Sequence, residues 1–172
     1  MEKFLTIVKE MKVVIFDMYG VINFGSGVSP TVLQTLKTLR EDGKIVIILS
    51  NASFGSADAV SKYAKKGMFK GVHYDDVVTS GQFGYEAIQR GDVPVPGTTM
   101  YVFGTANFKR PEDKLPDLFK DSVYSVTEDM EKADFAYCGV PQIHGEDRID
   151  IDDFIPELEK IRKRNLEMVC AN

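Results

Sequence analysis

The chain has 172 residues, of which 44% are hydrophobic and 27% are charged, proportions that allow a folded domain with a sizeable core. Its net charge of −5 argues against a protein that binds the phosphate backbone of nucleic acids. The longest apolar run of sheet-like residues covers positions 45–49 and is far too short to cross a bilayer, so we expect no membrane association.

The cysteines and the N-terminal residues favour a cytoplasmic protein. Cys138 and Cys170 lie in apolar, strand-like runs and form no CxxC motif, so we expect both to be buried, reduced thiols. Residues 1–12 alternate charged and apolar positions, and they lack the apolar core and small-residue cleavage site of a signal peptide. A short amphipathic helix is the most that residues 1–11 predict.

The first predicted elements are a strand and a helix. Residues 12–16 read KVVIF, a continuous apolar run that is typical of a strand in a sheet buried on both faces, and Asp17 follows at once. After a glycine-rich loop, Ser29 is placed to cap a helix whose first position is Pro30. Gly43 is placed to end that helix in a left-handed conformation.

The second strand defines an edge at which polar residues meet. Residues 44–49 form another apolar strand, and Ser50 follows it. A strand–helix–strand unit of this kind closes with a right-handed crossover, which makes its two strands parallel. We therefore expect Asp17 and Ser50 at the same edge, the carboxyl edge at which open α/β sheets bind their ligands.

The rest of the chain continues the alternation of helices and strands and contains no internal repeat. Helices are predicted at residues 56–66, 81–90 and 152–164, and strands at residues 77–80, 100–104, 122–126, 135–140 and 167–171. The pattern predicts an α/β fold with a parallel sheet.

Five residues at the expected edge could carry phosphoryl chemistry. The carboxylate of Asp17 could attack phosphorus and form an aspartyl-phosphate, which divides one difficult displacement into two easier steps. Asp17 and the backbone carbonyl of Tyr19 could each give Mg²⁺ an oxygen ligand. Ser50 and the N–H of Asn51 could hold a phosphoryl oxygen, and Gly20 would let the chain turn tightly beside the substrate.

Plainer interpretations of these and other polar residues stay open. An aspartate after a strand often only caps the following turn, and Asn51 and Ser53 can simply form hydrogen bonds within a loop. His73 and His144 lie in polar stretches and are expected at the solvated surface. The acidic residues between positions 146 and 153 lack the Gly and Glu of a calcium-binding loop, so we expect a solvated face there.

Several stretches of the chain resemble the haloacid dehalogenase superfamily. VVIFDMYGVI, at residues 13–22, is similar to its first motif. IVIILSNAS, at residues 45–53, is similar to its second motif, in which a Ser or Thr binds the phosphoryl group. Residues 54–68 and VVTSGQFGYEAI, at residues 77–88, resemble subclass IIA, whose members include nucleotide, p-nitrophenyl phosphate, phosphoglycolate and pyridoxal phosphate phosphatases.

This resemblance implies a division of the chain into core and cap. Residues 1–79 would be the N-terminal part of a Rossmann-like core with a parallel sheet, and residues 80–172 an inserted α/β cap domain. TMYVFGTANF, ADFAYCGV and NLEMVCAN resemble strands of that cap. No residue matches the Lys of the third motif or the acidic Mg²⁺ ligands of the fourth, so we expect a chain that is truncated before them.

Two departures from the family pattern affect the expected activity. Tyr19 stands where the family has a second Asp that serves as general acid and base; a tyrosine could donate a proton but is a poor base for activating water. With the later motifs unmatched, we expect Mg²⁺ to bind weakly or not at all and turnover to be poor. Strand edges left exposed by an incomplete sheet also favour a homo-oligomer.

The leading hypothesis is therefore a Mg²⁺-dependent, phosphatase-type hydrolase that acts on a small phosphorylated metabolite. Asp17 and Tyr19 would be its catalytic residues and Mg²⁺ ligands, and Ser50, Asn51 and Gly20 would bind the phosphate. The alternative is a non-catalytic α/β binding or regulatory module that kept the fold and lost the chemistry. A receiver-like domain phosphorylated on Asp17 is a weaker third interpretation, because receivers need an acidic pair at an earlier strand.

Overall fold

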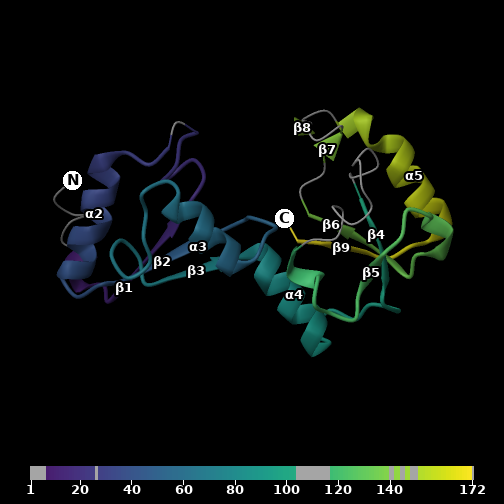
Figure 1. Ribbon diagram of the computed structural model, residues 1–172, viewed down its shortest axis with the longest axis horizontal. Helices are drawn as coiled ribbons and strands as arrows, with labels where there is room; N and C mark the ends of the chain where they lie inside the picture. The colour runs from purple at the N-terminus through teal and green to yellow at the C-terminus, as the bar shows by residue number, and fades with distance from the viewer. Residues whose placement is uncertain are drawn as a thin grey trace. The chain divides into compact units, whose positions relative to one another are not determined.

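The computed structural model describes residues 7–25, 27–103, 117–139, 142–143, 146–147 and 151–171. The chain forms two compact units, one of residues 1–51 with 56–79 and one of residues 52–55 with 80–172. Their helices and strands are labelled in Figure 1. The identification of these units as core and cap remains a proposal.

The first unit is a parallel sheet of three strands in the order β1-β2-β3. The strands are β1 (Val13–Asp17), β2 (Ile45–Ser50) and β3 (Asp76–Thr79), and the connecting helices are α2 (Pro30–Glu41) and α3 (Ser56–Ala64). Both crossovers step in the same direction along the sheet. Because such crossovers are right-handed, α2 and α3 lie on the same face.

The ends of α2 form as the sequence predicted. The side chain of Ser29 accepts a hydrogen bond from the backbone N–H of Val32 at 3.3 Å, and Pro30 occupies the first turn. Gly43, just beyond the helix, has a φ of +78°, a conformation that costs glycine little. These local signals fix the length of the helix and so the point at which β2 begins.

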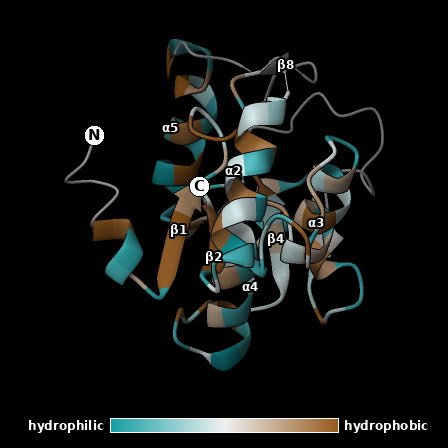
Figure 2. Cartoon of the chain, turned by 90° about the vertical axis from the view of Figure 1, so that its left-hand side faces the viewer, coloured by the Kyte–Doolittle hydropathy of each residue, from teal (hydrophilic) through white to brown (hydrophobic). Residues whose placement is uncertain are grey.

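One face of the first sheet is exposed and apolar. Along β2, Val46 and Ile48 are buried under the helices. The opposite side, here called the sheet face, consists of side chains with exposed fractions between 40% and 60%: Val13, Ile15, Ile45, Leu49 and Val78. Figure 2 shows β1 coloured as hydrophobic along most of its length. The prediction of a sheet buried on both faces was therefore wrong for the described residues, because both helices cover the same side.

Two polar residues near β3 are held within the first unit. Asp75 accepts hydrogen bonds from Arg40 at 2.7 Å and from the N–H of Val46 at 2.8 Å, and the hydrogen bond from Arg40 lowers the pKa of the Asp75 carboxyl. His73 is buried, and its Nδ1 accepts a hydrogen bond from the N–H of Phe69 at 2.9 Å. The prediction of a solvated His73 was wrong, because its ring closes the turn before β3; burial lowers its pKa.

The second unit is built on a parallel sheet of four strands in the order β5-β4-β6-β9. Its strands are β4 (Thr99–Val102), β5 (Ser125–Val126), β6 (Phe135–Cys138) and β9 (Met168–Cys170), and its helices are α4 (Ser80–Arg90) and α5 (Ile155–Arg164). Short 3-10 turns cover Asp117–Phe119, Met130–Lys132 and Ile151–Asp153, and the strands β7 (Gln142–Ile143) and β8 (Glu146–Asp147) pair antiparallel. His144 and Asp150 lie outside the described residues.

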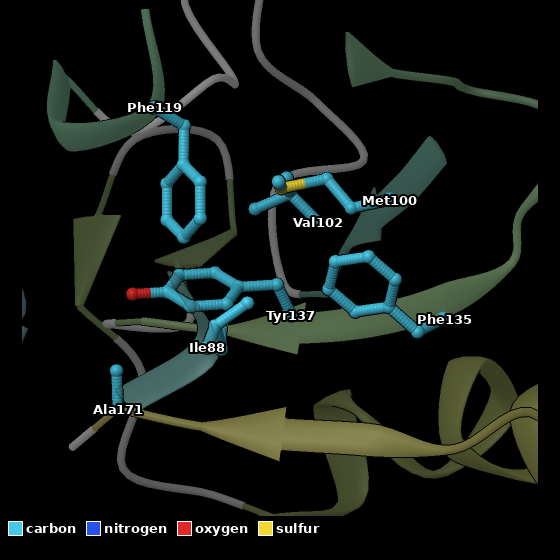
Figure 3. Close-up of a cluster of buried hydrophobic side chains, with 7 residues drawn as sticks. All are labelled: Ile88, Met100, Val102, Phe119, Phe135, Tyr137 and Ala171. Carbon is cyan, nitrogen blue, oxygen red and sulfur yellow. The ribbon is translucent and has the colours of Figure 1, made fainter. Parts of the chain in front are cut away.

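Aromatic side chains dominate the core of the second unit. The ring of Phe119 meets that of Tyr137 edge-on, with centroids 5.1 Å apart, and those of Tyr85 and Tyr124 at 5.0 and 5.5 Å. Figure 3 shows this core cluster between α4 and the strands: Ile88, Met100, Val102, Phe119, Phe135, Tyr137 and Ala171. Such edge-to-face pairs add to the stabilisation that apolar burial gives.

The two cysteines lie opposite each other in the second sheet. Cys138 on β6 and Cys170 on β9 are register partners, and both are free thiols. Cys138 is buried as predicted, but Cys170 is exposed, because β9 lies at the edge of the sheet. Among the described residues, no helix is both long enough and apolar enough to span a membrane.

Candidate functional site

The strand ends bring two of the predicted site residues to one edge of the first sheet. Asp17 is the register partner of Leu49, and Ser50, the next residue of β2, is the partner of Thr79 on β3. Since side chains alternate along a strand, Asp17 and Leu49 share the exposed face, whereas Ser50 points to the face under the helices. Asp17 and Ser50 thus share an edge but leave it on different faces.

The loop after Asp17 is fixed by its own hydrogen bonds. The N–H of Met18 donates to Asp17 Oδ1 at 2.7 Å, and the carbonyl of Met18 accepts from the N–H of Asn23 at 2.8 Å. Gly20 donates to the carbonyl of Asn23 at 2.9 Å and has a φ of +82°, which a side chain would make costly. Within this turn, Tyr19 is 48% exposed. The loop therefore presents Tyr19 and one edge of the Asp17 carboxylate to solvent.

Two buried hydroxyl groups of the first unit belong to Ser50 and to Tyr63, a tyrosine that the sequence analysis did not single out. Ser50 is 2% exposed, and Tyr63 on α3 is fully buried. Among the described residues, neither hydroxyl has a hydrogen-bond partner in good geometry. The pKa of Tyr63 is raised to about 12, mainly by burial; the Ser50 hydroxyl lowers it, and Tyr19, Tyr74 and Asp17 contribute to raising it.

Two further residues lie at this edge: Asn51, which the sequence predicted as a site residue, and Thr79, which it did not. Asn51 follows β2 directly and is exposed. Thr79 ends β3 beside Ser50 and is fully buried; it lies within the family-like stretch at residues 77–88, but the sequence analysis gave it no role. Tyr63 could have been noticed because it carries a hydroxyl on the apolar side of a predicted helix. The catalytic and phosphate-binding roles of Asp17, Tyr19, Gly20, Ser50 and Asn51 remain predictions.

The described residues at this edge do not complete a Mg²⁺ site. Asp17 offers a carboxylate and Tyr19 a backbone carbonyl, whereas Mg²⁺ prefers six oxygen ligands in an octahedron, some of them water. No group of three or more His, Cys, Asp or Glu side chains that could hold a metal ion is found within the described part of the chain. No chemical step is therefore derived through this ion.

A hollow of about 790 Å³ lies elsewhere on the first unit, along α2. It is lined by Val8, Lys9, Pro30, Thr31, Gln34, Thr35, Thr38, Leu39, Asp42 and Lys44. None of the predicted site residues contributes to this hollow. The candidate site remains the edge at Asp17 and Ser50, because the carboxyl ends of parallel strands are where open α/β sheets bind ligands.

Comparison with known proteins identifies relatives of the same fold. Residues 14–115 match the family model described as haloacid dehalogenase-like hydrolase. The structure is similar to that of a haloacid dehalogenase-like family hydrolase from Brucella suis 1330, with a TM-score of 0.78 and 21% identity over 97% of this chain and 56% of that one. Among curated proteins, none matches the chain.

Two further solved structures carry more specific descriptions. One is a 4-nitrophenylphosphatase from Thermotoga maritima, with a TM-score of 0.58 and 18% identity over 96% of this chain and 56% of that one. The other is NagD from E. coli K-12, with a TM-score of 0.54 and 19% identity over 94% of this chain and 57% of that one. At these identities the likeness is one of fold, and the chain spans a little over half the length of each solved chain.

Proposed function

Because this chain belongs to the haloacid dehalogenase-like hydrolase family, we propose that it is a member of subclass IIA and that its candidate site transfers a phosphoryl group from a small phosphorylated metabolite to Asp17. The observation that carries this proposal is the placement of a carboxylate and a hydroxyl at the ends of adjacent parallel strands. That edge is where open α/β sheets hold their ligands.

The proposed reaction has two steps. A carboxylate oxygen of Asp17 attacks phosphorus, the bond from phosphorus to the leaving oxygen breaks, and the Tyr19 phenol gives its proton to that oxygen. Water then attacks the aspartyl-phosphate, which releases phosphate, restores the Asp17 carboxylate and returns a proton to Tyr19. In this proposal the N–H of Asn51 holds a phosphoryl oxygen, and the Gly20 turn leaves room beside it. Ser50 would hold another phosphoryl oxygen only after its side chain turns out from under the helices, where it is buried in this structure.

Family membership adds two expectations to this proposal. Mg²⁺ would shield the negative charges of carboxylate and phosphate, with Asp17 and the carbonyl of Tyr19 giving two of its ligands. The free thiols Cys138 and Cys170 fit a reducing compartment, so we expect the protein in the cytoplasm.

Phosphate release from p-nitrophenyl phosphate in the presence of Mg²⁺ tests the proposal. We expect a slow reaction with the wild-type chain and a rate at the background level with Asp17→Asn, because the amide cannot attack phosphorus. Asp121→Asn is the matched control, since Asp121 is an exposed aspartate in the second unit. Equal rates for the wild type and Asp17→Asn would remove the enzymatic claim. Ligand-dependent stabilisation without any turnover would instead support the non-catalytic binding module.

A further inference from the structure

The two cysteines of the chain lie opposite each other on neighbouring strands of the second unit. Cys138 on β6 and Cys170 on β9 are register partners in a parallel pair, and Figure 1 shows the two strands side by side. The N–H of Ala171 donates to the carbonyl of Cys138 at 2.9 Å, so the strands are paired at this point. Paired strands lie about 4.7–4.9 Å apart, within the span of about 4.4–6.8 Å between the Cα atoms of disulfide-bonded cysteines.

Both thiols also lie on the same face of this sheet. Side chains alternate between the two faces along a strand. Val169 and Ala171, the neighbours of Cys170, pack with the aromatic core cluster of Figure 3, so Cys170 points to the other face. Cys138 lies on that other face as well, in a separate buried cluster that includes Phe154. The two sulfur atoms are therefore directed to the same side of adjacent strands.

The two thiols differ in their access to solvent. Cys170 is exposed, whereas Cys138 is buried, and burial raises the pKa of Cys138 to about 12. A dissolved oxidant therefore reaches Cys170 first, while Cys138 lies beside it and is still protonated. An accessible cysteine next to a second thiol that can resolve its oxidised form is typical of redox-sensitive pairs.

We propose that Cys170 is a site of oxidation by peroxides, and that Cys138 resolves the oxidised form by making a disulfide with it. The sulfur of Cys170 attacks one oxygen of hydrogen peroxide, the O–O bond breaks, and the products are a sulfenic acid at Cys170 and water. The sulfur of Cys138 then attacks the sulfenic sulfur, an S–S bond replaces the S–O bond, and the departing hydroxide takes the Cys138 proton as water. The two thiols lose two electrons in total, which the peroxide accepts.

The strands can accept this bond with a small adjustment. The Cβ atoms of a disulfide lie about 3.5–4.5 Å apart, slightly closer than the spacing of paired strands. Within the described part of the chain, β9 pairs with β6 alone, so it can shift toward β6 without breaking a second pairing. Cys138 gives up a long hydrogen bond, 3.8 Å from its sulfur to the carbonyl of Gly139. A dithiol reductant would reverse the bond by thiol–disulfide exchange.

The test treats the full chain with hydrogen peroxide and determines the state of both thiols. The treated chain is alkylated under denaturing conditions, and its mass is measured without reduction. We expect neither cysteine to be alkylated and the chain to be lighter by two hydrogen atoms. After digestion with trypsin, residues 133–148 and 165–172 should be recovered as one disulfide-linked pair of peptides, which dithiothreitol separates.

Two single variants distinguish the roles of the two thiols. Alanine is the substitute at both positions, because it is small and suits the apolar surroundings of Cys138. In Cys138→Ala the accessible thiol has lost its resolving partner, so dimedone should label a sulfenic acid at Cys170, which it should not do in the oxidised wild type. In Cys170→Ala the same dose of peroxide should leave Cys138 a thiol, because Cys138 is buried.

Three results would overturn the inference. The first is a treated wild-type chain in which both thiols can still be alkylated. The second is a Cys170 that is oxidised to a sulfinic acid, or linked to a second chain, while Cys138 remains a thiol, since Cys138 would then not reach it. Both are measured on the wild type and require no variant to fold. The third is oxidation of Cys138 in Cys170→Ala, which would show that Cys170 is not the thiol that reacts first. None of these results bears on the proposed phosphatase activity, so the two proposals fail separately.

Discussion

Tyr19 is the residue on which the rate of the proposed reaction depends most. A tyrosine at this position can supply a proton but is a poor base for the water that must attack the aspartyl-phosphate. We expect Tyr19→Asp to raise the rate of phosphate release about 10²-fold, the lower range of what a positioned acid and base contributes. The measurement is steady-state hydrolysis of p-nitrophenyl phosphate with Mg²⁺.

The matched variant Tyr19→Phe separates the effect of the phenol proton on the rate from the effect of the aromatic ring. It keeps the aromatic side chain, which is half-exposed, and removes only the hydroxyl. The rate should fall below that of the wild type if the phenol protonates the leaving oxygen. No gain in Tyr19→Asp together with no loss in Tyr19→Phe would show that position 19 takes no part in the chemistry.

At the scale of single residues, the sequence predicted which residues lie at strand ends better than it predicted which side chains are buried. It placed Asp17 and Ser50 at the ends of adjacent strands, which the register of β1 and β2 confirms. It missed Tyr63 and predicted a solvated His73, because burial depends on residues that fold over a position from elsewhere in the chain. Tyrosine and histidine are intermediate in their tendency to be buried, so the residue type alone does not predict their burial.

At the scale of elements, the start of α4 depends on a glycine with no room for a side chain. Gly81 donates its N–H to the carbonyl of Ala52 at 3.0 Å, and a Cβ at Gly81 would overlap the backbone carbonyl of Ser53. We expect Gly81→Ala to lower the free energy of unfolding by about 1–3 kcal/mol, as other substitutions that overfill a packed site do. Urea unfolding followed by circular dichroism measures this change.

A second glycine in the same helix provides the control. A Cβ at Gly84 would lie 3.6 Å from the Cβ of Ala171, an ordinary contact. Gly84→Ala should therefore leave stability unchanged or raise it by about 0.5–1 kcal/mol, because alanine loses less backbone freedom in a helix. Similar effects of the two substitutions would mean that the loop before α3 does not press against α4.

Elements with strong local signals were predicted well, and short ones were not. The helix α2 was predicted at both ends because its cap, its first-turn proline and its final glycine are all local to the chain. The strands β7 and β8 have two residues each, too few for any periodicity, and were not predicted. The strand predicted at residues 122–126 is shorter in the structure, where it covers only Ser125–Val126.

At the scale of the whole molecule, the apolar strands of the first unit did not reveal which of their faces is covered. A continuous apolar run is typical of a strand with neighbours on both sides, and KVVIF fits that pattern. The described helices α2 and α3 nevertheless lie on one side, since both crossovers have the same hand and direction. The run correctly indicated a parallel sheet. It could not show whether helices cover one face of that sheet or both, because this depends on the rest of the fold.

From the sheet face we predict that the chain associates with itself. Contiguous exposed apolar surface of this kind is typical of interaction sites, because its removal from water is favourable. We expect the chain to form concentration-dependent oligomers, and Ile15→Glu to shift them toward monomers by placing a charge in the middle of that surface. Sedimentation equilibrium at several concentrations measures the shift, and Val123→Glu is the control, because Val123 is an exposed apolar residue of the second unit. A wild-type chain that stays monomeric at all concentrations, or equal shifts in the two variants, would show that the sheet face does not drive association.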